Sequence, residues 1–317
     1  MTVHKSASDV AISSHAAAMA VSARTKAAAA LALLVVVVLV ATRPRAPAAP
    51  QFAYSAHGFR VNGGPSRPLL EPNEAEYQMS EGGQDRVLWE ELFRNDSQAD
   101  SGFFVEFGAR GGVYDSNTYF FEKKLGWRGL LLEASPTEQK TIGADRPLSA
   151  AIDGGVCESD QKLEFAAAEK GWGGRLDSYD ESRAKTAAFQ TLIVPCFTLR
   201  TLFDLFRVRH VSYMSVDTEG SELLALKGFP WGEVSVDVVG VEVVTGSPDR
   251  LAKEAELLDY LRSKGMVVFI EYQFAKDTKD VFFRPAAPSR RAANDYAHFE
   301  KMRALCVRMQ RCLGPAR

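Results

Sequence analysis

Between residues 80 and 285, short apolar segments alternate with amphipathic ones, which predicts strands that alternate with helices. The segments that predict strands are 103–107, 129–132, 150–152, 162–166, 192–197, 211–216, 234–244, 266–270 and 281–283. The segments that predict helices are 80–93, 119–125, 199–206, 221–227 and 249–264. Strands that alternate with helices form a parallel sheet with helices on both faces. We therefore expect an α/β fold with a mostly parallel sheet, whose last two strands form a terminal antiparallel hairpin.

Residues 103–136 are the most informative part of this pattern. The apolar segment 103–107 precedes Gly108 and Gly112, which permit a tight turn and a close approach of the backbone to a ligand. A helix follows, and the next apolar segment ends on Glu133. A strand, a glycine turn, a helix and a strand that ends on an acid form the layout of a Rossmann-like nucleotide site. In such a site the acid hydrogen-bonds ribose hydroxyls.

The spacing of the glycines bears on which nucleotide is bound. The turn reads E-x-G-x-x-x-G, with Glu106 two residues before Gly108, whereas the dinucleotide fingerprint is G-x-G-x-x-G. An acid at this place repels a pyrophosphate and suits a ligand with positive charge, such as S-adenosylmethionine. The alternative is that Glu106 is a surface acid and the glycines only turn the chain. Two acids at successive strand ends, Glu106 and Glu133, favour the ligand site.

Polar residues mark where two of the predicted helices begin. Asp115 and Ser116 are expected to cap the helix 119–125, because short oxygen-bearing side chains accept hydrogen bonds from the first free N–H groups. The first predicted helix begins with the residues GGQD at 82–85, and their polarity is that of an ordinary helix start. After 285 the chain is basic, and 286–317 is expected to be a solvated tail with a helix near 294–313.

The N-terminal residues predict a membrane segment. Residues 27–42 (AAAALALLVVVVLVAT) carry no charge and span about 24 Å as a helix, slightly short of a bilayer core. We expect a cytoplasmic tail at 1–26, a signal anchor at 27–42, a stem at 43–78 and the folded domain at 79–285. This organisation predicts a single-pass protein whose domain lies in the lumen of the Golgi or endoplasmic reticulum. A cleaved signal peptide with secretion, and targeting to another organelle, are the alternatives.

Composition excludes little beyond nucleic-acid binding. Charged residues make up 25% of the 317 residues and the formal net charge is -2, so no basic surface for nucleic acid is expected. The four cysteines form no C-x-x-C pair, and no cluster predicts a metal site. Cys157 with Cys196, and Cys306 with Cys312, are possible disulfides in an oxidising compartment, and buried free thiols are the equal alternative.

The motifs resemble a known family. The sequence EFGARGGVYDSNTYFFEKKLGWRGLLLEASP, preceded by GGQD and followed by SVDTEGSELLALKGF, resembles the FkbM-type methyltransferases over residues 80–284. This resemblance implies a class I fold that binds S-adenosylmethionine and methylates a hydroxyl, often of a sugar or natural product. It implies that Glu133 holds the ribose and that Asp153 approaches the adenine. The full set of cofactor-binding residues that it implies is Glu106, Phe107, Gly108, Gly112, Asn117, Glu133 and Asp153.

The resemblance also places acids on the acceptor side of the cleft. Methyl transfer to a hydroxyl requires a base, and Asp217 is the first candidate because it ends a central strand at the cofactor edge. Glu242, on the next strand, is the second candidate. Glu219 and His210 are the candidates for substrate binding. The alternatives are that Glu219 is a helix-start acid favoured by the helix dipole, and that His210 is only a loop residue.

Three functions compete at this stage. The first is a membrane-anchored O-methyltransferase that acts on a glycan or related metabolite. The second is a non-catalytic anchored interaction or trafficking protein that keeps the fold. It depends on two departures from the family pattern, Gly111 in place of a common acid and valines at 243 and 244 in place of a common asparagine. The third, a glycosyltransferase, is disfavoured because no DxD metal motif follows a strand, and DSYD at 177–180 has the wrong spacing.

Overall fold

The computed structural model describes residues 75–95, 101–139, 142, 145–168, 173–177, 189–245, 247–287 and 292–309. The predicted tail, anchor and nearly all of the predicted stem lie outside these residues. No helix within the described residues is long and apolar enough to cross a membrane.

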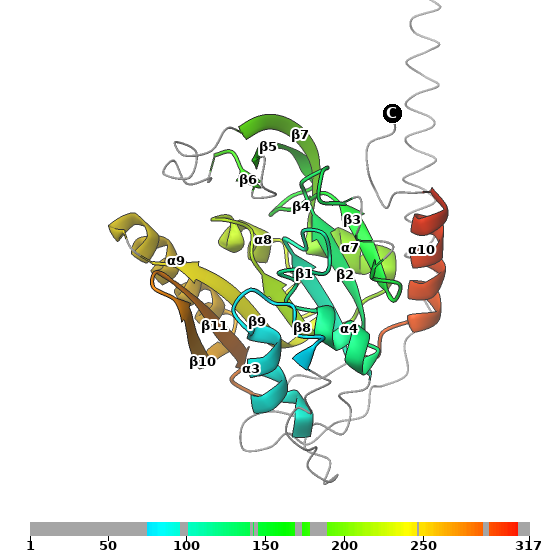
Figure 1. The fold of residues 1–317 in the computed structure, drawn as a ribbon, viewed down its shortest axis with the longest axis horizontal. Coiled ribbons are helices and arrows are strands. Elements are labelled where there is room, and N and C mark those ends of the chain that lie inside the picture. The colour runs from blue at the N-terminus through cyan, green and yellow to red at the C-terminus, as the bar shows by residue number, and fades with distance from the viewer. Residues whose placement is uncertain are drawn as a thin grey trace, which may run out of the picture. The chain divides into compact units, whose positions relative to one another are not determined.

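A seven-stranded sheet in the order β10-β11-β9-β8-β1-β2-β3 forms the centre of the domain (Figure 1). Its strands β1, β2, β3, β8 and β9 pair in parallel, and β10 and β11 form the predicted antiparallel hairpin against β9. The bounds are β1 Phe103–Phe107, β2 Arg128–Glu133, β3 Ser149–Asp153, β8 His210–Val216, β9 Ser235–Val244, β10 Met266–Ala275 and β11 Thr278–Pro285. The α/β fold expected from the alternation is therefore confirmed.

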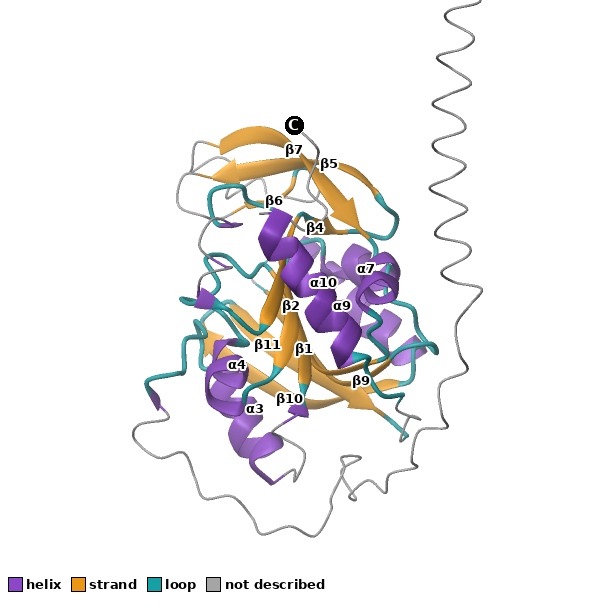
Figure 2. Ribbon diagram, turned by 90° about the vertical axis from the view of Figure 1, so that its right-hand side faces the viewer, coloured by secondary structure: helices purple, strands orange, loops and turns teal. Residues whose placement is uncertain are grey.

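Helices cover both faces of this sheet because successive side chains of each strand point to opposite faces (Figure 2). One face packs against α3 (Gln84–Glu91) and α4 (Tyr119–Leu125), and its core includes Phe104. The short 3₁₀ helix η1 (Phe93–Asn95) follows α3 on this face. The other face packs against α7 (Leu199–Phe206), α8 (Glu222–Lys227), α9 (Pro248–Ser263) and α10 (Tyr296–Met309), and its core includes Phe103 and Phe107.

Two predicted strands belong to a separate, smaller sheet in the order β4-β7-β5-β6. Its strands are β4 (Gly155–Val156), β5 (Gln161–Ala168), β6 (Gly173–Arg175) and β7 (Phe189–Phe197). The β5 and β7 strands pair antiparallel with each other in this sheet and do not join the main sheet. A disulfide joins Cys157 to Cys196, with 2.06 Å between the sulfur atoms, so these two cysteines are not free thiols. The other possible pair includes Cys312, which lies outside the described residues.

The C-terminal helix is part of the core and not a solvated tail. Phe299 of α10 is 1% exposed, and its ring makes an edge contact with Phe103 at 5.3 Å between centroids. Arg128 of β2 forms an ion pair with Glu300 at 2.5 Å. An apolar stripe on a basic segment therefore packs against the sheet, and the folded domain extends beyond residue 285.

The expected cap of α4 is also corrected. The residue before the first helical turn is Thr118, and neither Asp115 nor Ser116 caps the helix. Asp115 has a positive φ of 61° and pairs with Arg110, and the Ser116 hydroxyl donates to Glu106 at 2.9 Å. Both side chains therefore bind residues of β1 or of the turn after it, and neither binds the helix.

Candidate active site

The turn after β1 brings two loops of the sheet into contact. Gly108 has a positive φ of 72°, and a Cβ added there would collide with the carbonyl oxygen of Asp217, which follows β8. The N–H groups of Gly108 and Ala109 donate to the carbonyl oxygen of Leu132 at 3.0 and 3.2 Å. Only glycine permits both this conformation and this approach. Gly108 therefore joins the ends of β1, β2 and β8 into one edge.

Glu133 stands at the end of β2 beside that turn. One carboxylate oxygen accepts the N–H of Arg110 and the other accepts the N–H of Ser135, each at 2.7 Å. The side chain is 6% exposed, and burial raises its pKa to about 7 against the opposing effect of these hydrogen bonds. Each oxygen keeps a lone pair beyond its one N–H donor, which leaves the carboxylate able to accept hydroxyl groups.

A pocket with an empty volume of about 690 Å³, part of it open to solvent, lies at this edge. The turns after β1 and β8 and the end of β2 form one side, and the smaller sheet forms the other. The lining residues are Phe107, Gly108, Arg110, Leu132, Glu133, Ala134, Gly154, Gly155, Val156, Leu163, Phe165, Gly173, Gly174, Arg175, Asp217, Thr218, Glu219 and Ser221.

The smaller sheet gives the pocket an apolar wall. Val156, Leu163 and Phe165 line it, and a Cβ on Gly173 would stand 2.5 Å from the Phe165 ring. The Cys157–Cys196 disulfide ties β4, at the start of this wall, to β7. The sequence indicated a loop over the ligand site at 171–180, and its described part includes β6, which lines the pocket. Such a wall is suited to a planar, weakly polar ring.

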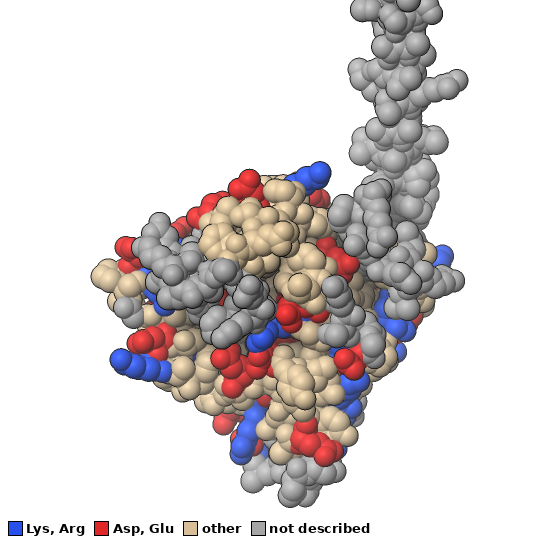
Figure 3. All heavy atoms as spheres, turned by 45° about the horizontal axis from the view of Figure 1, so that its top comes forward, with Lys and Arg blue, Asp and Glu red and all other residues tan. Residues whose placement is uncertain are grey.

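Acids slightly outnumber bases around the pocket. Glu133, Asp217 and Glu219 line it together with Arg110 and Arg175, and Arg175 is itself paired with Asp177 at 2.7 Å. The face that carries the smaller sheet also shows several acidic side chains close together (Figure 3). The described lining residues therefore offer a phosphate-rich ligand no excess of positive charge, which a neutral or positively charged ligand does not require.

The turn after β8 presents Asp217 and Glu219 to the pocket. Glu219 has a positive φ of 57°, so it belongs to the turn and not to the helix start. The helix-start acid is Glu222, which accepts the N–H groups of Thr218 at 3.1 Å and Gly220 at 2.8 Å. This arrangement favours the pocket interpretation of Glu219 over the helix-start alternative.

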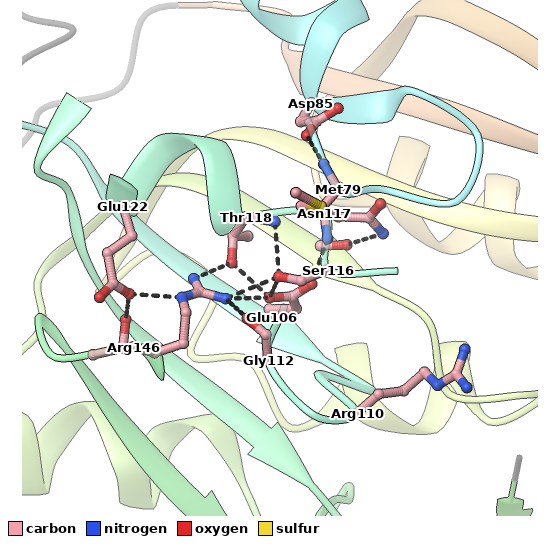
Figure 4. A network of polar contacts seen from close by, with 12 residues as sticks. Met79, Asp85, Glu106, Arg110, Gly112, Ser116, Asn117, Thr118, Glu122 and Arg146 are labelled. Atoms are coloured by element: carbon pink, nitrogen blue, oxygen red, sulfur yellow. Dashed lines mark hydrogen bonds and ion pairs between the residues drawn. The ribbon is translucent and has the colours of Figure 1, made fainter. Parts of the chain in front are cut away.

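Glu106 is buried and does not line the pocket. One of its oxygens accepts the N–H of Asn117 at 2.6 Å (Figure 4). The other accepts the hydroxyls of Ser116 at 2.9 Å and Thr118 at 2.5 Å. Burial raises the pKa of Glu106, and the charge of Arg146 opposes this, with 3.7 Å between the closest nitrogen and oxygen. The positive partner expected for Glu106 is therefore an arginine of the protein itself.

Arg146 was not predicted from the sequence, although it organises this region. Its side chain is fully buried and donates to Glu122 at 2.8 Å, to the carbonyl oxygen of Gly112 at 2.8 Å and to Thr118 at 2.8 Å (Figure 4). Gly112, with a φ of 79°, thus belongs to the network that holds the turn and not to the pocket lining. No motif surrounds Arg146 in the sequence, and only the fold brings its partners together.

The other predicted residues divide between the pocket edge and its surroundings. Asp153 ends β3 in register with Glu133, and the adjacent Gly154 lines the pocket. Asn117 lies behind the pocket, where its side-chain amide donates to Ser215 at 3.0 Å. Glu242 lies on β9 near its end and is not part of the lining.

His210 is not in the site. It is the first residue of β8, whereas the pocket lies after the last residues of the parallel strands. Its ring nitrogens contact Ser235 at 2.9 Å and Asp237 at 3.1 Å. His210 therefore lies away from the pocket, because β8 runs from the histidine toward it, and its predicted role in substrate binding stays a prediction without support from this position.

Comparison with known protein families shows which family this chain belongs to. Residues 106–304 match the model of the methyltransferase FkbM domain. The chain belongs to this family. It is thus a methyltransferase domain whose cofactor is S-adenosylmethionine. No curated protein matches the chain in sequence.

Three solved structures with a related arrangement are remote from this chain. Fibrillarin from Aeropyrum pernix, solved with natively bound S-adenosyl-L-methionine, has a TM-score of 0.34 and 10% identity, with 57% of this chain and 66% of that chain covered. A SAM-dependent methyltransferase from Aquifex aeolicus has a TM-score of 0.34 and 10% identity, with 67% and 93% covered. The human methyltransferase 10 domain containing protein has a TM-score of 0.34 and 11% identity, with 68% and 83% covered. The chain thus spans about two thirds of the fibrillarin structure, and these likenesses are too low to carry an argument about function.

Proposed function

We propose that this methyltransferase acts on oxygen, and that its acceptor is a hydroxyl of a glycan or related metabolite. The observation that carries the proposal is the pocket in which Glu133 and Asp217 face one cavity, joined through Gly108. In this proposal Glu133, at the end of β2, holds the ribose, and Asp217, which follows the central strand β8, faces the acceptor. The membrane anchor at 27–42 and a domain in the secretory lumen are part of this proposal.

The residues of the pocket fit the cofactor. Glu133 has lone pairs for the two ribose hydroxyls, and Val156, Leu163 and Phe165 offer an apolar surface for the adenine. The ends of β2 and β3 lie in register, which brings Asp153 and Gly154 to the adenine side. S-adenosylmethionine supplies, when bound, a methyl group on a positively charged sulfur, and the acidic lining is compatible with that charge.

The chain's own part in the reaction is to hold the acceptor and remove a proton. Asp217 is placed to accept the proton of the attacking hydroxyl, while the new carbon–oxygen bond forms as the carbon–sulfur bond breaks. Precise alignment of the reacting atoms contributes strongly to such a displacement. General-base removal of a proton typically contributes 10²–10⁴-fold. Glu219, in the same turn, is placed to bind a neighbouring polar group of the acceptor.

The disulfide supports the proposed compartment. Disulfides such as Cys157–Cys196 persist in oxidising environments and are rare in the cytosol. This favours a luminal domain behind the predicted anchor. Protease protection of the full-length chain in sealed microsomes tests this, because a luminal domain survives digestion and a cytoplasmic one does not.

Calorimetric titration of S-adenosylmethionine into the full-length chain in mild detergent tests the function. Full length matters because a fragment that ends at Pro285 lacks Phe299 of the core. We expect micromolar binding, lost in Glu133→Ala. The matched control is Glu164→Ala, which changes an exposed glutamate of β5 between the pocket residues Leu163 and Phe165. No binding by the folded wild type, or equal binding by Glu133→Ala, would refute the proposal and favour an anchored interaction protein.

A further inference from the structure

Three acids line up across neighbouring strands at the pocket edge of the main sheet. Val216 pairs with Val241, so Asp217 follows β8 at the level of Glu242 on β9. Glu242 in turn pairs directly with Asp280 of β11. Because residues two apart in a strand share a face, these side chains lie on the face that packs against α3 and α4. Asp280, which no motif indicated, thus belongs to the acceptor side.

One oxygen of Asp280 lacks a partner. The side chain is 4% exposed, and its Oδ2 atom has no hydrogen bond among the described residues. The Gln84 side chain donates a hydrogen bond to the carboxyl group. Buried polar atoms are almost always paired, so this oxygen is open to a partner from a ligand or a water molecule.

A second unpaired acceptor lies on the same face. The Oδ1 atom of Asn117 is buried without a hydrogen bond among the described residues, while the amide nitrogen donates to Ser215 at 3.0 Å. Ser215 also hydrogen-bonds Tyr213, and the pKa of Tyr213 is raised, first by burial and then by charges that include Asp280. Ser215 lies on β8, two residues before Asp217. The two unpaired oxygens therefore flank the strand that presents the proposed base.

The turn before α3 is built to hold Gln84 against Asp280. Gly82 packs so closely on the ring of Phe274 that an added Cβ would overlap it. Its carbonyl oxygen accepts the Tyr272 hydroxyl at 2.8 Å, and its N–H donates to the Gln84 side-chain oxygen at 2.8 Å. The amide nitrogen of Gln84 is thereby directed to Asp280. The GGQD residues are thus more than a helix start, because they dock on the hairpin and cover this carboxyl group.

The charge state of Asp280 fits a neutral, hydroxyl-rich acceptor. Burial raises its pKa to about 8, and the negative charges of Asp217 and Glu81 add to this. Glu242 faces it from β9. At neutral pH the carboxyl group is therefore mostly protonated, and because Gln84 donates to one oxygen, the proton is placed on the other. A neutral acid of this kind both donates to and accepts from sugar hydroxyls.

We propose that Asp280 binds the methyl acceptor beside Asp217, with Oδ2 on a hydroxyl next to the one that is methylated. This rests on the proposed function. It names the acceptor as a polyol with neighbouring hydroxyls. Because Oδ2 is buried, an acceptor reaches it only if the neighbouring chain moves, and we expect the turn at 80–83 to move, since it contacts the hairpin through Tyr272 and Phe274. Asp280 is thus a specificity-determining residue.

Saturation-transfer NMR tests this with the full-length chain loaded with S-adenosylhomocysteine. The probes are methyl glycosides of glucose, galactose, mannose, xylose, fucose and N-acetylglucosamine. We expect at least one to bind, at least tenfold more weakly to Asp280→Ala. Asp280→Asn keeps an N–H donor in place of the acid proton, so its binding at pH 7 is close to wild type. Wild-type binding falls above pH 8 as the acid ionises, whereas Asp280→Asn binding does not.

The control is Asp237→Asn, which removes another buried acid at the opposite edge of the same sheet, beside His210. Its glycoside binding should match the wild type, and melting curves verify that all variants fold. The inference is overturned if no glycoside binds, if Asp280→Ala binds as well as wild type, or if Asp280→Asn follows the wild-type pH profile. Titration of S-adenosylmethionine into the same samples separates this result from the proposed function, which fails only if the cofactor itself does not bind.

Discussion

Glu106 and Asp280 are buried acids on the same face of one sheet, yet their surroundings differ. Glu106 is 1% exposed and accepts hydrogen bonds from Asn117, Ser116 and Thr118, with Arg146 nearby as counter-ion. Asp280 is 4% exposed and is bonded by Gln84, and one of its oxygens has no hydrogen-bond partner among the described residues. A fully paired acid stabilises a fixed structure, whereas an unpaired one costs stability that a ligand can return. This difference supports a structural role for the glycine turn and the proposed binding role for the hairpin.

Glu133 lies between these two extremes. It is as buried as Asp280, but two backbone N–H groups hold it and leave room for further donors. Its position at the end of β2 was indicated by the strand pattern alone. The number of hydrogen-bond partners thus decreases from Glu106 to Glu133 to Asp280. This order follows their proposed roles, which are to hold the turn, to bind the cofactor and to bind the acceptor.

The largest expected effect comes from removing the counter-ion of the scaffold acid. Arg146→Met leaves Glu106 and Glu122 buried without their positive partner, and loss of one side of a buried ion pair typically costs about 3–5 kcal/mol. Urea denaturation measures this cost. Arg262→Met is the control, because it breaks an exposed pair with Asp259 and should cost about 0–1 kcal/mol. A cost for Arg146→Met no greater than for the control would show that the network is not the scaffold described.

The sequence predicts what local pattern determines. The bounds of β1 and α4 and the place of Glu133 follow from apolar runs, glycines and strand ends, which act over a few residues. The direction of the strands would also have argued against His210. A residue at the start of a parallel strand lies at the edge of the sheet away from the site. Arg146 and Asp280 were not predictable, because their roles depend on partners far apart in the sequence that only the fold brings together.

The next effect is on stability and has a defined pH window. The pKa of Asp280 is about 8 in the folded protein against 3.8 ordinarily, so between these values the native state holds a proton that the unfolded state has lost. Its contribution therefore falls as pH rises, by about 1.4 kcal/mol per pH unit, until it levels off near pH 8. Asp280→Asn removes this term. We expect its stability relative to wild type to rise by roughly 2–3 kcal/mol between pH 6 and pH 9.

Urea denaturation of both proteins at pH 6 and pH 9 measures this change. The difference in the free energy of unfolding between the two proteins is compared at the two pH values, so the effects of all other titrating groups cancel. Asp237→Asn serves again as the buried-acid control at the other edge. A double difference near zero would mean that Asp280 is ionised at pH 6, and the contrast with the paired Glu106 would then lose its basis.

The smallest expected effect is on the affinity for the cofactor and concerns Glu133, which has fewer hydrogen-bond partners than Glu106 and more than Asp280. With its pKa raised to about 7 by burial, Glu133 is mostly neutral at pH 5.5 and mostly ionised at pH 8.5. The ionised carboxylate accepts both ribose hydroxyls, whereas the neutral acid gives up part of that capacity. The affinity for S-adenosylmethionine should therefore rise with pH, by roughly ten- to thirtyfold over this range. The amino group of the ligand titrates in the same pH range and also changes the affinity. The ratio of the wild-type affinity to the Glu133→Gln affinity at each pH therefore isolates the contribution of Glu133. A ratio that stays constant with pH would place Glu133 outside the cofactor contact, and the acids of this sheet would no longer sort by partner number into scaffold, cofactor and acceptor roles.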